Sequence, residues 1–231
     1  MSGASAPREH PSGSSAPHER VGRPSAPSAR DEVLARVRAA NAAAGSPRPP
    51  DVPRAYRTAG AHPPGAPELL DLLRDRLVDY RARVVDARPG EVPAAIRIAL
   101  AEVGGPVLVP AGLPAGWYPE GVPDEGALTP AELDRFAAVV TGCAAACAET
   151  GTIALDGSAE QGRRAITLVP DVHVCVVRAD QVVASVPELL ARLEPARPIT
   201  FVSGPSATSD IELQRVEGVH GPRTLVVVLA T

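Results

Sequence analysis

The chain has 231 residues, 45% of them hydrophobic, and its 23 basic residues oppose 27 acidic ones, which gives a formal charge of −4. This composition is typical of one globular domain with extensions. Every basic residue is an arginine, and the absence of lysine excludes Schiff-base catalysis, pyridoxal phosphate attachment and a Walker P-loop. The three cysteines form no C-x-x-C pair, which argues against a disulfide framework, a zinc ribbon or a ferredoxin-type cluster.

The hydrophobic segments are too short for a membrane span. The apolar stretch at residues 225–230 is far below the roughly 18 residues that a spanning helix needs. The first residues lack the apolar region of a signal peptide. We therefore expect a cytoplasmic protein in a reducing environment.

Composition divides the chain into three parts. Residues 1–30 contain 20 Ala, Gly, Pro or Ser, so a disordered leader is expected over 1–28. Apolar positions at helical spacing then predict a short amphipathic helix over 29–44, followed by a Pro-rich extended linker to residue 66. The remaining segment, 67–231, is predicted to be the folded domain.

Charge follows the same division. Residues 1–63 hold nine arginines and five acids, whereas residues 64–231 hold fourteen arginines and 22 acids. An acidic domain disfavours nonspecific binding to nucleic acid. The positively charged segment, residues 1–63, could dock on the acidic domain or on a partner protein. The alternative is that its charges only keep the chain solvated.

The folded domain alternates helical and strand patterns. Helices are predicted over 69–81 and 92–103, and another is predicted to start at Thr129-Pro130, where the spacing is that of a capping box. Strands are predicted over 83–86, 106–110, 138–141, 152–155, 165–169, 173–178, 199–203 and 224–230. Strands of nearly continuous Val, Ile and Leu are buried on both faces. The fold class is thus α/β, with three α/β/α layers and a mostly parallel sheet. Short turns within 153–178 predict added antiparallel strands, which would make that sheet mixed.

One candidate ligand segment is Glu149-Thr150-Gly151-Thr152, just before a predicted strand. Gly151 suits a turn with positive φ, and the hydroxyl and carboxylate groups around it are predicted to face a cleft. The alternative is that these residues only cap a turn.

A second candidate follows the apolar strand at 199–203. Gly204, Ser206 and Thr208 lie where a strand, a glycine turn and a predicted helix start would present free N–H groups to an anion. Asp210 and Glu212 oppose an anion there, because they place negative charge at the same helix start. Plain helix capping is the alternative.

His220 lies in a glycine- and proline-bounded turn before the last strand. Its imidazole is a candidate general base, ligand or hydrogen-bonding group, and the alternative is a structural role. Glu212, His173 and His220 match no metal-ligand spacing, so no metal site is expected.

Arg163 and Arg164 are candidate anion binders, although the surrounding sequence indicates an exposed hairpin tip. Cys143 and Cys147 would share one face of a helix, which suggests redox chemistry, but inert buried thiols are favoured.

Three segments in succession carry a family resemblance: AETGTIAL, GRRAITLVPDVHVCVVRADQVV and FVSGPSATSDIELQRVEGVHGPRTLVVVL. Together they resemble the lactate utilization protein C family (LutC/YkgG), whose body is a LUD domain, and the resemblance covers about residues 67–231. By motif position it carries over Glu149, Thr150, Gly151, Thr152, His173, Gly204, Pro205, Ser206, Thr208, Asp210, Glu212, His220 and Gly221. Ala207 departs from the family pattern, in which many relatives have a basic residue.

The resemblance implies a fold like that of the NagB/RpiA/CoA-transferase-like group. It implies a non-redox subunit that helps to oxidise L-lactate to pyruvate, with no cofactor of its own and with iron–sulfur clusters in partner subunits. A small carboxylate is a possible ligand, for which Glu149, Asp210, Glu212 and His220 are the expected polar contacts, with His220 the best acid or base. Two alternatives stay open: a free-standing enzyme of the cyclo-ligase or CoA-transferase type, and a regulatory or scaffolding module.

Overall fold

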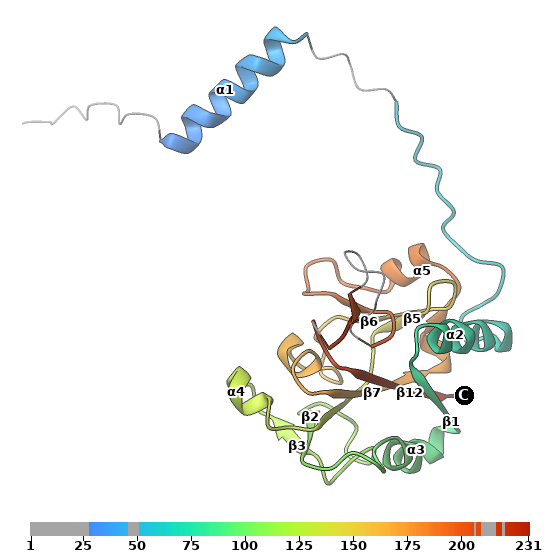
Figure 1. Cartoon of the computed structure of the whole chain (residues 1–231). Helices are drawn as coiled ribbons and strands as arrows, with labels where there is room; N and C mark the ends of the chain where they lie inside the picture. Colours follow the sequence, from blue (N-terminus) through green and yellow to red (C-terminus); the bar gives the residue numbers. More distant parts are fainter. Residues whose placement is uncertain (1–27, 46–50, 206, 209–215, 219) are drawn as a thin grey trace, which may run out of the picture. The chain divides into compact units, whose positions relative to one another are not determined.

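The computed structural model describes residues 28–45, 51–205, 207–208, 216–218 and 220–231, and these residues fall into two units that divide between Arg54 and Ala55. The α-helices are α1 (Ala29–Ala43), α2 (Pro67–Asp79), α3 (Val92–Ala99), α4 (Pro130–Leu133) and α5 (Val186–Ala191) (Figure 1). The strands are β1 (Arg83–Ala87), β2 (Val107–Pro110), β3 (Val122–Asp124), β4 (Ala138–Thr141), β5 (Ala145–Cys147), β6 (Thr152–Leu155), β7 (Val172–Arg178), β8 (Val182–Val183), β9 (Thr200–Val202), β10 (Ala207–Thr208), β11 (Val216–Glu217) and β12 (Thr224–Ala230). Short 3-10 turns are η1 (Pro89–Glu91), η2 (Arg164–Thr167) and η3 (Ala179–Gln181).

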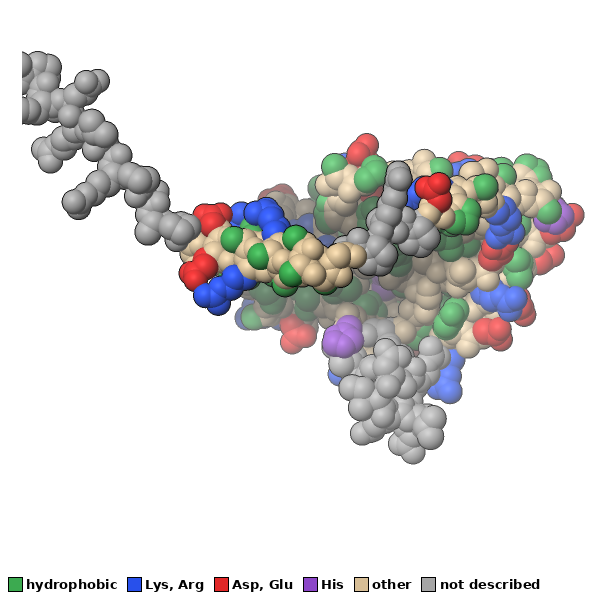
Figure 2. Space-filling view, turned by 90° about the horizontal axis from the view of Figure 1, so that it is seen from above, with side chains coloured by type: hydrophobic (Ala, Val, Ile, Leu, Met, Phe, Trp, Pro, Cys, Tyr) green, Lys and Arg blue, Asp and Glu red, His purple; other side chains and the backbone are tan. Residues whose placement is uncertain are grey.

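The first unit contains α1, which confirms the helix predicted over 29–44. A capping box starts it: the Asp31 N–H donates to Ser28 Oγ at 3.3 Å, and Ser28 Oγ donates to the Asp31 carboxylate at 2.7 Å. The helix has no buried residue, and Val33 and Val37 are 59% and 50% exposed. Hydrophobic side chains therefore stand between charged ones along its surface (Figure 2).

The second unit is built on a six-stranded sheet in the order β1-β12-β7-β4-β2-β3, in which every pairing is parallel. Val174 of β7 lies between Val226 of β12 and Val140 of β4 at its centre. The predicted α/β class, with a mostly parallel sheet flanked by helices, is confirmed.

Both faces of this sheet are covered. Val226 and Val228 of β12 face α3, whereas Leu225, Val227 and Leu229 face α2 and a second sheet. Successive side chains of a strand point to opposite faces, so a strand between two apolar layers needs an uninterrupted apolar sequence. The sequence of β12, TLVVVLA, meets that requirement.

The second sheet has four strands in the order β8-β5-β6-β9. Here β6 pairs antiparallel with β5 and β9, whereas β5 pairs parallel with β8. Of the segments predicted to add antiparallel strands to the main sheet, 152–155 (β6) is antiparallel but belongs to this second sheet. The prediction was wrong for 173–178 (β7), which pairs parallel within the main sheet. The strand predicted over 165–169 was wrong, because Arg164–Thr167 forms a 3-10 turn between β6 and β7. Cys147 ends a strand, so the run around it is not helical.

The chain between residues 55 and 66 is fixed to the second sheet. The Gly65 N–H donates to the Val182 carbonyl of β8 at 2.9 Å, and Arg57 pairs with Glu149 at 2.6 Å. A Cβ on Gly60 would lie 2.1 Å from the Ala184 Cβ, so the backbone passes directly over the end of β8.

The helix start predicted after Gly204 is not present over the described residues. Ala207–Thr208 instead forms β10, which pairs antiparallel with β11. Ser206, Asp210 and Glu212, three of the predicted site residues, lie outside the described residues, as does the side chain of Thr208.

Surface charge is mixed. On the face shown in Figure 2, acidic and basic side chains are interspersed rather than gathered by sign. Within the part of the chain that the structure describes, no helix combines the length and hydropathy that crossing a membrane requires.

Candidate functional site

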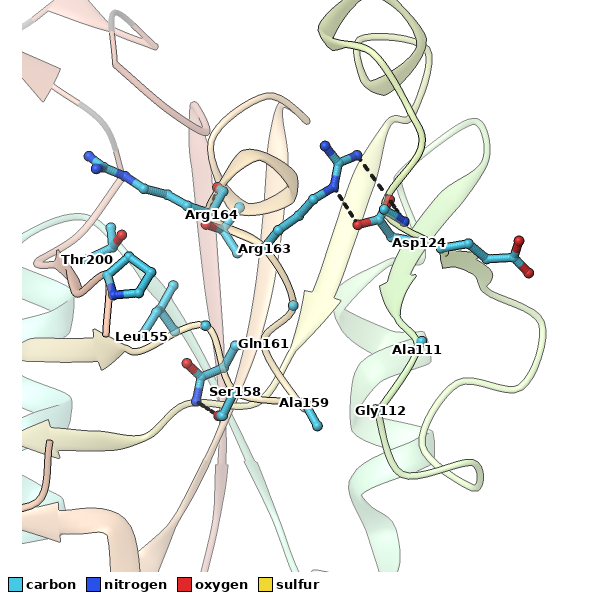
Figure 3. Close-up of a pocket in the computed structure, with 16 residues that line it drawn as sticks. Ala111, Gly112, Asp124, Leu155, Ser158, Ala159, Gln161, Arg163, Arg164 and Thr200 are labelled. Carbon is cyan, nitrogen blue, oxygen red and sulfur yellow. Dashed lines mark hydrogen bonds and ion pairs between the residues drawn. The ribbon is translucent and has the colours of Figure 1, made fainter. Parts of the chain in front are cut away.

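A hollow with a volume of about 580 Å³ lies at the carboxyl ends of β2, β3 and β6 (Figure 3). The loops that follow these strands form its walls, so backbone geometry places the hollow where open parallel sheets bind their ligands. It is lined by Ala111, Gly112, Asp124, Glu125, Gly126, Leu155, Gly157, Ser158, Ala159, Gln161, Gly162, Arg163, Arg164, Thr167, Pro198 and Thr200.

A charged pair forms one side of this hollow. Arg163 Nε and Nη2 donate to the Asp124 carboxylate at 2.8 and 3.0 Å, and Nη2 also donates to the Leu128 carbonyl at 2.9 Å. The Asp124 side chain is only 3% exposed. The hydrogen bonds from Arg163 hold the pKa of this carboxyl below its usual value, although burial acts the other way. The Arg163 guanidinium therefore has a structural role, because its hydrogen bonds compensate the buried Asp124 carboxylate.

Arg164 differs from its neighbour. It is exposed, and its guanidinium extends away from Asp124, on the side of Thr200 (Figure 3). Within the described ranges, no hydrogen bond or ion pair is formed by this guanidinium. Of the two adjacent arginines singled out in the sequence, only Arg164 is available to a ligand.

A smaller hollow of about 250 Å³ adjoins the first, because Thr167 and Thr200 line both. Its wall combines the carboxyl end of β9 at 203–205, the turn at 220–222 and the start of β7. Five residues carried over from the family motifs line this hollow: His173, Gly204, Pro205, His220 and Gly221. They come from three segments that are far apart in sequence, and the pairing of β7 with β12 brings His173 and the turn at 220–222 to the same sheet edge.

His173 is buried, with 1% of its surface exposed, and its Nε2 lies 2.7 Å from Thr141 Oγ1. Burial lowers the pKa of this imidazole from 6.5 to about 4, so the ring is neutral near pH 7. A neutral, hydrogen-bonded histidine orients polar groups rather than binding an anion by charge. Among the described residues, no group of three or more His, Cys, Asp or Glu is placed to hold a metal ion.

The predicted segment 149–152 lies beside the smaller hollow. Thr150 Oγ1 donates to Thr152 Oγ1 at 2.8 Å, and Thr152 Oγ1 is 2.9 Å from Ser203 Oγ, which lines that hollow. Glu149 instead pairs with Arg57. The two candidate segments are thus adjacent through β6 and β9, but residues 149–152 line neither of the two hollows.

Gly151 and Gly204, the glycines of the two predicted ligand segments, both pack against the end of α2. Arg81, with φ 65°, ends this helix: the Ala82 N–H donates to the Leu77 carbonyl and the Arg81 N–H to the Val78 carbonyl. Gly204 has φ 86°, and a Cβ there would lie 2.7 Å from the Tyr80 carbonyl oxygen. A Cβ on Gly151, with φ 61°, would lie 2.7 Å from the Arg76 Cβ.

Replacing Gly204 by alanine is therefore expected to destabilise the protein by about 2–3 kcal/mol, since alanine is strained at positive φ and its Cβ would collide with backbone. Urea unfolding measures this loss. Gly90→Ala is the matched control, because a Cβ there meets nothing within 4 Å. Equal stability of the two variants would contradict the packing role.

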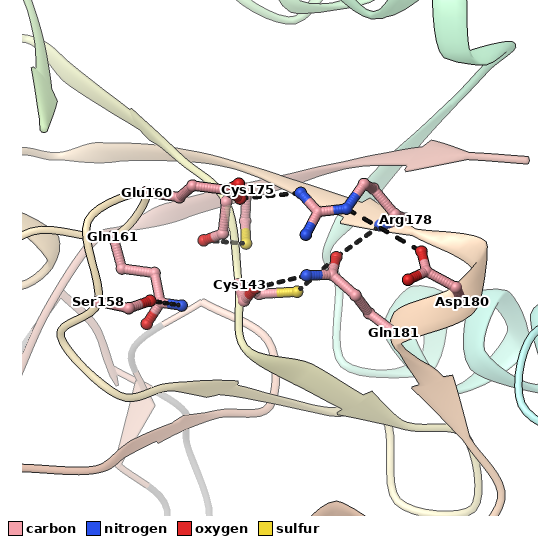
Figure 4. Close-up of polar contacts among 9 residues, drawn as sticks. Cys143, Ser158, Glu160, Gln161, Cys175, Arg178, Asp180 and Gln181 are labelled. Carbon is pink, nitrogen blue, oxygen red and sulfur yellow. Dashed lines mark hydrogen bonds and ion pairs between the residues drawn. The ribbon is translucent and has the colours of Figure 1, made fainter. Parts of the chain in front are cut away.

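The three cysteines are buried in the core. Cys143 Sγ donates to Gln181 Oε1 at 3.4 Å, and Gln181 Nε2 donates to the Cys143 carbonyl at 2.6 Å (Figure 4). Cys147 and Cys175 donate to the carbonyls of Ala184 and Gly142 at 3.5 and 3.6 Å. Hydrogen bonding with Cys175, and then burial, raise the pKa of the Cys143 thiol. The expectation of buried thiols is confirmed.

The fold and the two hollows define an α/β protein with a parallel central sheet and candidate ligand sites at the ends of its strands. The LUD domain family matches residues 114–230. The chain is 52% identical over 169 residues to a protein named "Lactate utilization protein C" from Deinococcus radiodurans, covering 70% of this chain and 79% of that protein. A protein of the same name from Bacillus pumilus is 32% identical over 188 residues, covering 70% and 78%.

A solved structure agrees with these similarities. The crystal structure of a DUF162 family protein from Deinococcus radiodurans superimposes with a TM-score of 0.61 at 45% identity, covering 71% of this chain and 97% of that one. The chain belongs to the LUD domain family, as its sequence motifs predicted, and its relatives of known name point to lactate utilization.

Proposed function

We propose that this chain is a non-redox subunit of an L-lactate utilization system, needed for the oxidation of L-lactate to pyruvate together with iron–sulfur partner proteins. The observation that carries the proposal is the 52% identity to a protein named for lactate utilization, over 79% of that protein's length.

The cysteine geometry supports a subunit without a cluster of its own. A cluster needs several converging, deprotonated thiolates. Here the three thiols are buried hydrogen-bond donors, and hydrogen bonding with Cys175, together with burial, raises the pKa of Cys143, which keeps that thiol protonated. In this proposal, electron transfer therefore belongs to the partner proteins.

The smaller hollow is the proposed place for a small carboxylate. Its volume of about 250 Å³ suits a small organic acid, and His220 and Gly204 contribute an imidazole and a backbone turn to its wall. The neutral His173 at its inner end is held by Thr141 and keeps that end polar.

Deleting the gene should abolish growth on L-lactate as sole carbon source and leave growth on pyruvate unchanged. The full chain should restore growth, and an affinity-tagged copy should co-purify with proteins that show iron–sulfur absorbance. Normal lactate growth of the deletion strain, or a tagged chain that purifies alone while lactate is oxidised at full rate, would contradict the proposal.

A second candidate is a free-standing enzyme of the NagB/RpiA/CoA-transferase-like group, favoured by two adjoining hollows at strand ends. Turnover of a thioester or a nucleotide by the purified chain would support this candidate.

A third candidate, a scaffolding module, predicts a different set of growth results. His220→Ala would then leave lactate growth unchanged, whereas disruption of α1 would abolish it.

A further inference from the structure

We propose that the larger hollow binds an organic anion bigger than lactate, with Arg164 holding its carboxylate or phosphate group and an apolar wall receiving its body. This inference goes beyond the proposed function, because it concerns a different hollow and a larger ligand.

The cation available to such a ligand is Arg164. The two arginines of this hollow differ in role. The guanidinium of Arg163 is hydrogen-bonded to the Asp124 carboxylate and to the Leu128 carbonyl. Arg164 lines the same hollow without a side-chain partner among the described residues. A guanidinium that is not engaged in the fold can form paired hydrogen bonds with a carboxylate or a phosphate.

The other polar groups of the hollow are mostly engaged. Gln161 donates to Ser158 Oγ at 2.8 Å and accepts from the Asp156 N–H at 2.6 Å. Thr167 Oγ1 donates to the Arg164 carbonyl at 3.0 Å, which holds the turn that carries Arg164. The Thr200 hydroxyl forms no hydrogen bond with another described residue, and it lies on the side toward which Arg164 extends (Figure 3). Arg164 and Thr200 therefore form the polar end of the site.

The rest of the lining is mostly apolar. It consists of small or aliphatic residues, namely Ala111, Gly112, Leu155, Ala159 and Pro198, of which Leu155 pairs with Thr200 across β6 and β9. A Cβ on Gly112 would lie 2.6 Å from the Ala159 carbonyl oxygen, so the loops after β2 and β6 approach each other without intervening side chains. Such a surface suits the apolar or planar part of a ligand.

Volume and charge define the class of ligand. The hollow, at about 580 Å³, falls within the range of roughly 300–1,000 Å³ that organic ligands occupy, and a three-carbon acid would fill little of it. Glu125 also lines the hollow and repels anions, whereas the charge of Asp124 is balanced by Arg163. The anionic group must therefore lie at the Arg164 end.

Calorimetric titration of the full chain tests this assignment with four probes: 3-phenyllactate, phenyl phosphate, L-lactate and inorganic phosphate. At least one of the two larger anions should bind more tightly than its small counterpart, and the tighter of the two identifies the carboxylate or phosphate head. Arg164→Gln should weaken that binding by about ten- to a hundredfold, because a charge-assisted hydrogen bond is lost.

Two variants complete the test. Arg83→Gln replaces an exposed arginine on β1, outside the hollow, and should leave affinity unchanged, whereas Glu125→Gln should strengthen binding. Absence of binding by both larger probes at millimolar concentration, or equal affinity of the Arg164→Gln and parent chains, would overturn the proposal. Because titration uses the isolated protein, its result is independent of the growth experiment that tests the role in lactate utilization.

Discussion

Lowering the pH from 7 to 5 is expected to remove about 2 kcal/mol of stability through His173 alone. The pKa of this buried imidazole is about 4 in the folded protein, against 6.5 for an ordinary histidine. Between these values the unfolded chain binds a proton that the folded chain does not, so stability falls as the pH drops below 6.5. The loss approaches about 3 kcal/mol near pH 4, since one pKa unit corresponds to about 1.4 kcal/mol.

Urea unfolding of the parent and of His173→Gln at pH 7 and pH 5 measures this contribution. Glutamine keeps a polar partner for Thr141 but does not titrate, and the other titrating groups are common to both proteins. The parent should lose about 2 kcal/mol more than the variant between the two pH values. The same pH dependence in both proteins would show that His173 is not held neutral in the core.

Replacing Arg163 by glutamine is expected to destabilise the protein by about 2–4 kcal/mol. The Asp124 carboxylate, 3% exposed, would lose the two hydrogen bonds that compensate its burial, with the Gly126 N–H at 3.3 Å remaining. Removing one partner of a buried ion pair leaves an uncompensated charge, which is costly. Arg164→Gln, one residue along, should change stability by no more than about 0.5 kcal/mol.

Thermal and urea unfolding of both variants measure the contrast. Adding Asp124→Asn to Arg163→Gln should recover part of the loss, because it removes the uncompensated charge. In the parent, the lowered pKa of Asp124 means that its stabilising contribution is present above the unfolded pKa and disappears as the pH falls through the folded one. Similar losses for the two arginine variants would contradict the assigned roles.

The fold was predictable where local pattern and burial agree. β12 is continuous in Val and Leu because both of its faces are buried, and α4 begins at the Thr129 capping box that the sequence predicted. The apolar run at 165–169 was misassigned, since a short apolar run does not distinguish a strand from a buried turn. Ala145 and Ala146 favour helix by propensity but lie fully buried in β5, where pairing with β6 and tertiary packing override that propensity.

The candidate site was less predictable. Gly204 and His220 were found because glycine turns bracket the last strands. Asp124 was missed, because 39 residues separate it from Arg163 and only the tertiary fold brings them together. The sequence pattern Val-Pro-Asp at the end of β3 offered one signal, a carboxylate just after a strand, but the Pro/Gly-rich surroundings gave it no partner.

The contact between Gly65 and β8 also determines where the second sheet ends. β8 is the outermost strand of that sheet, and an outermost strand exposes backbone groups to which a foreign chain can add. Here the protein's own preceding segment takes the Val182 carbonyl. A truncated protein that begins at Pro67 would keep every strand of the sheet but would leave the edge strand β8 uncovered. Such a protein is expected to self-associate by adding strands at this edge.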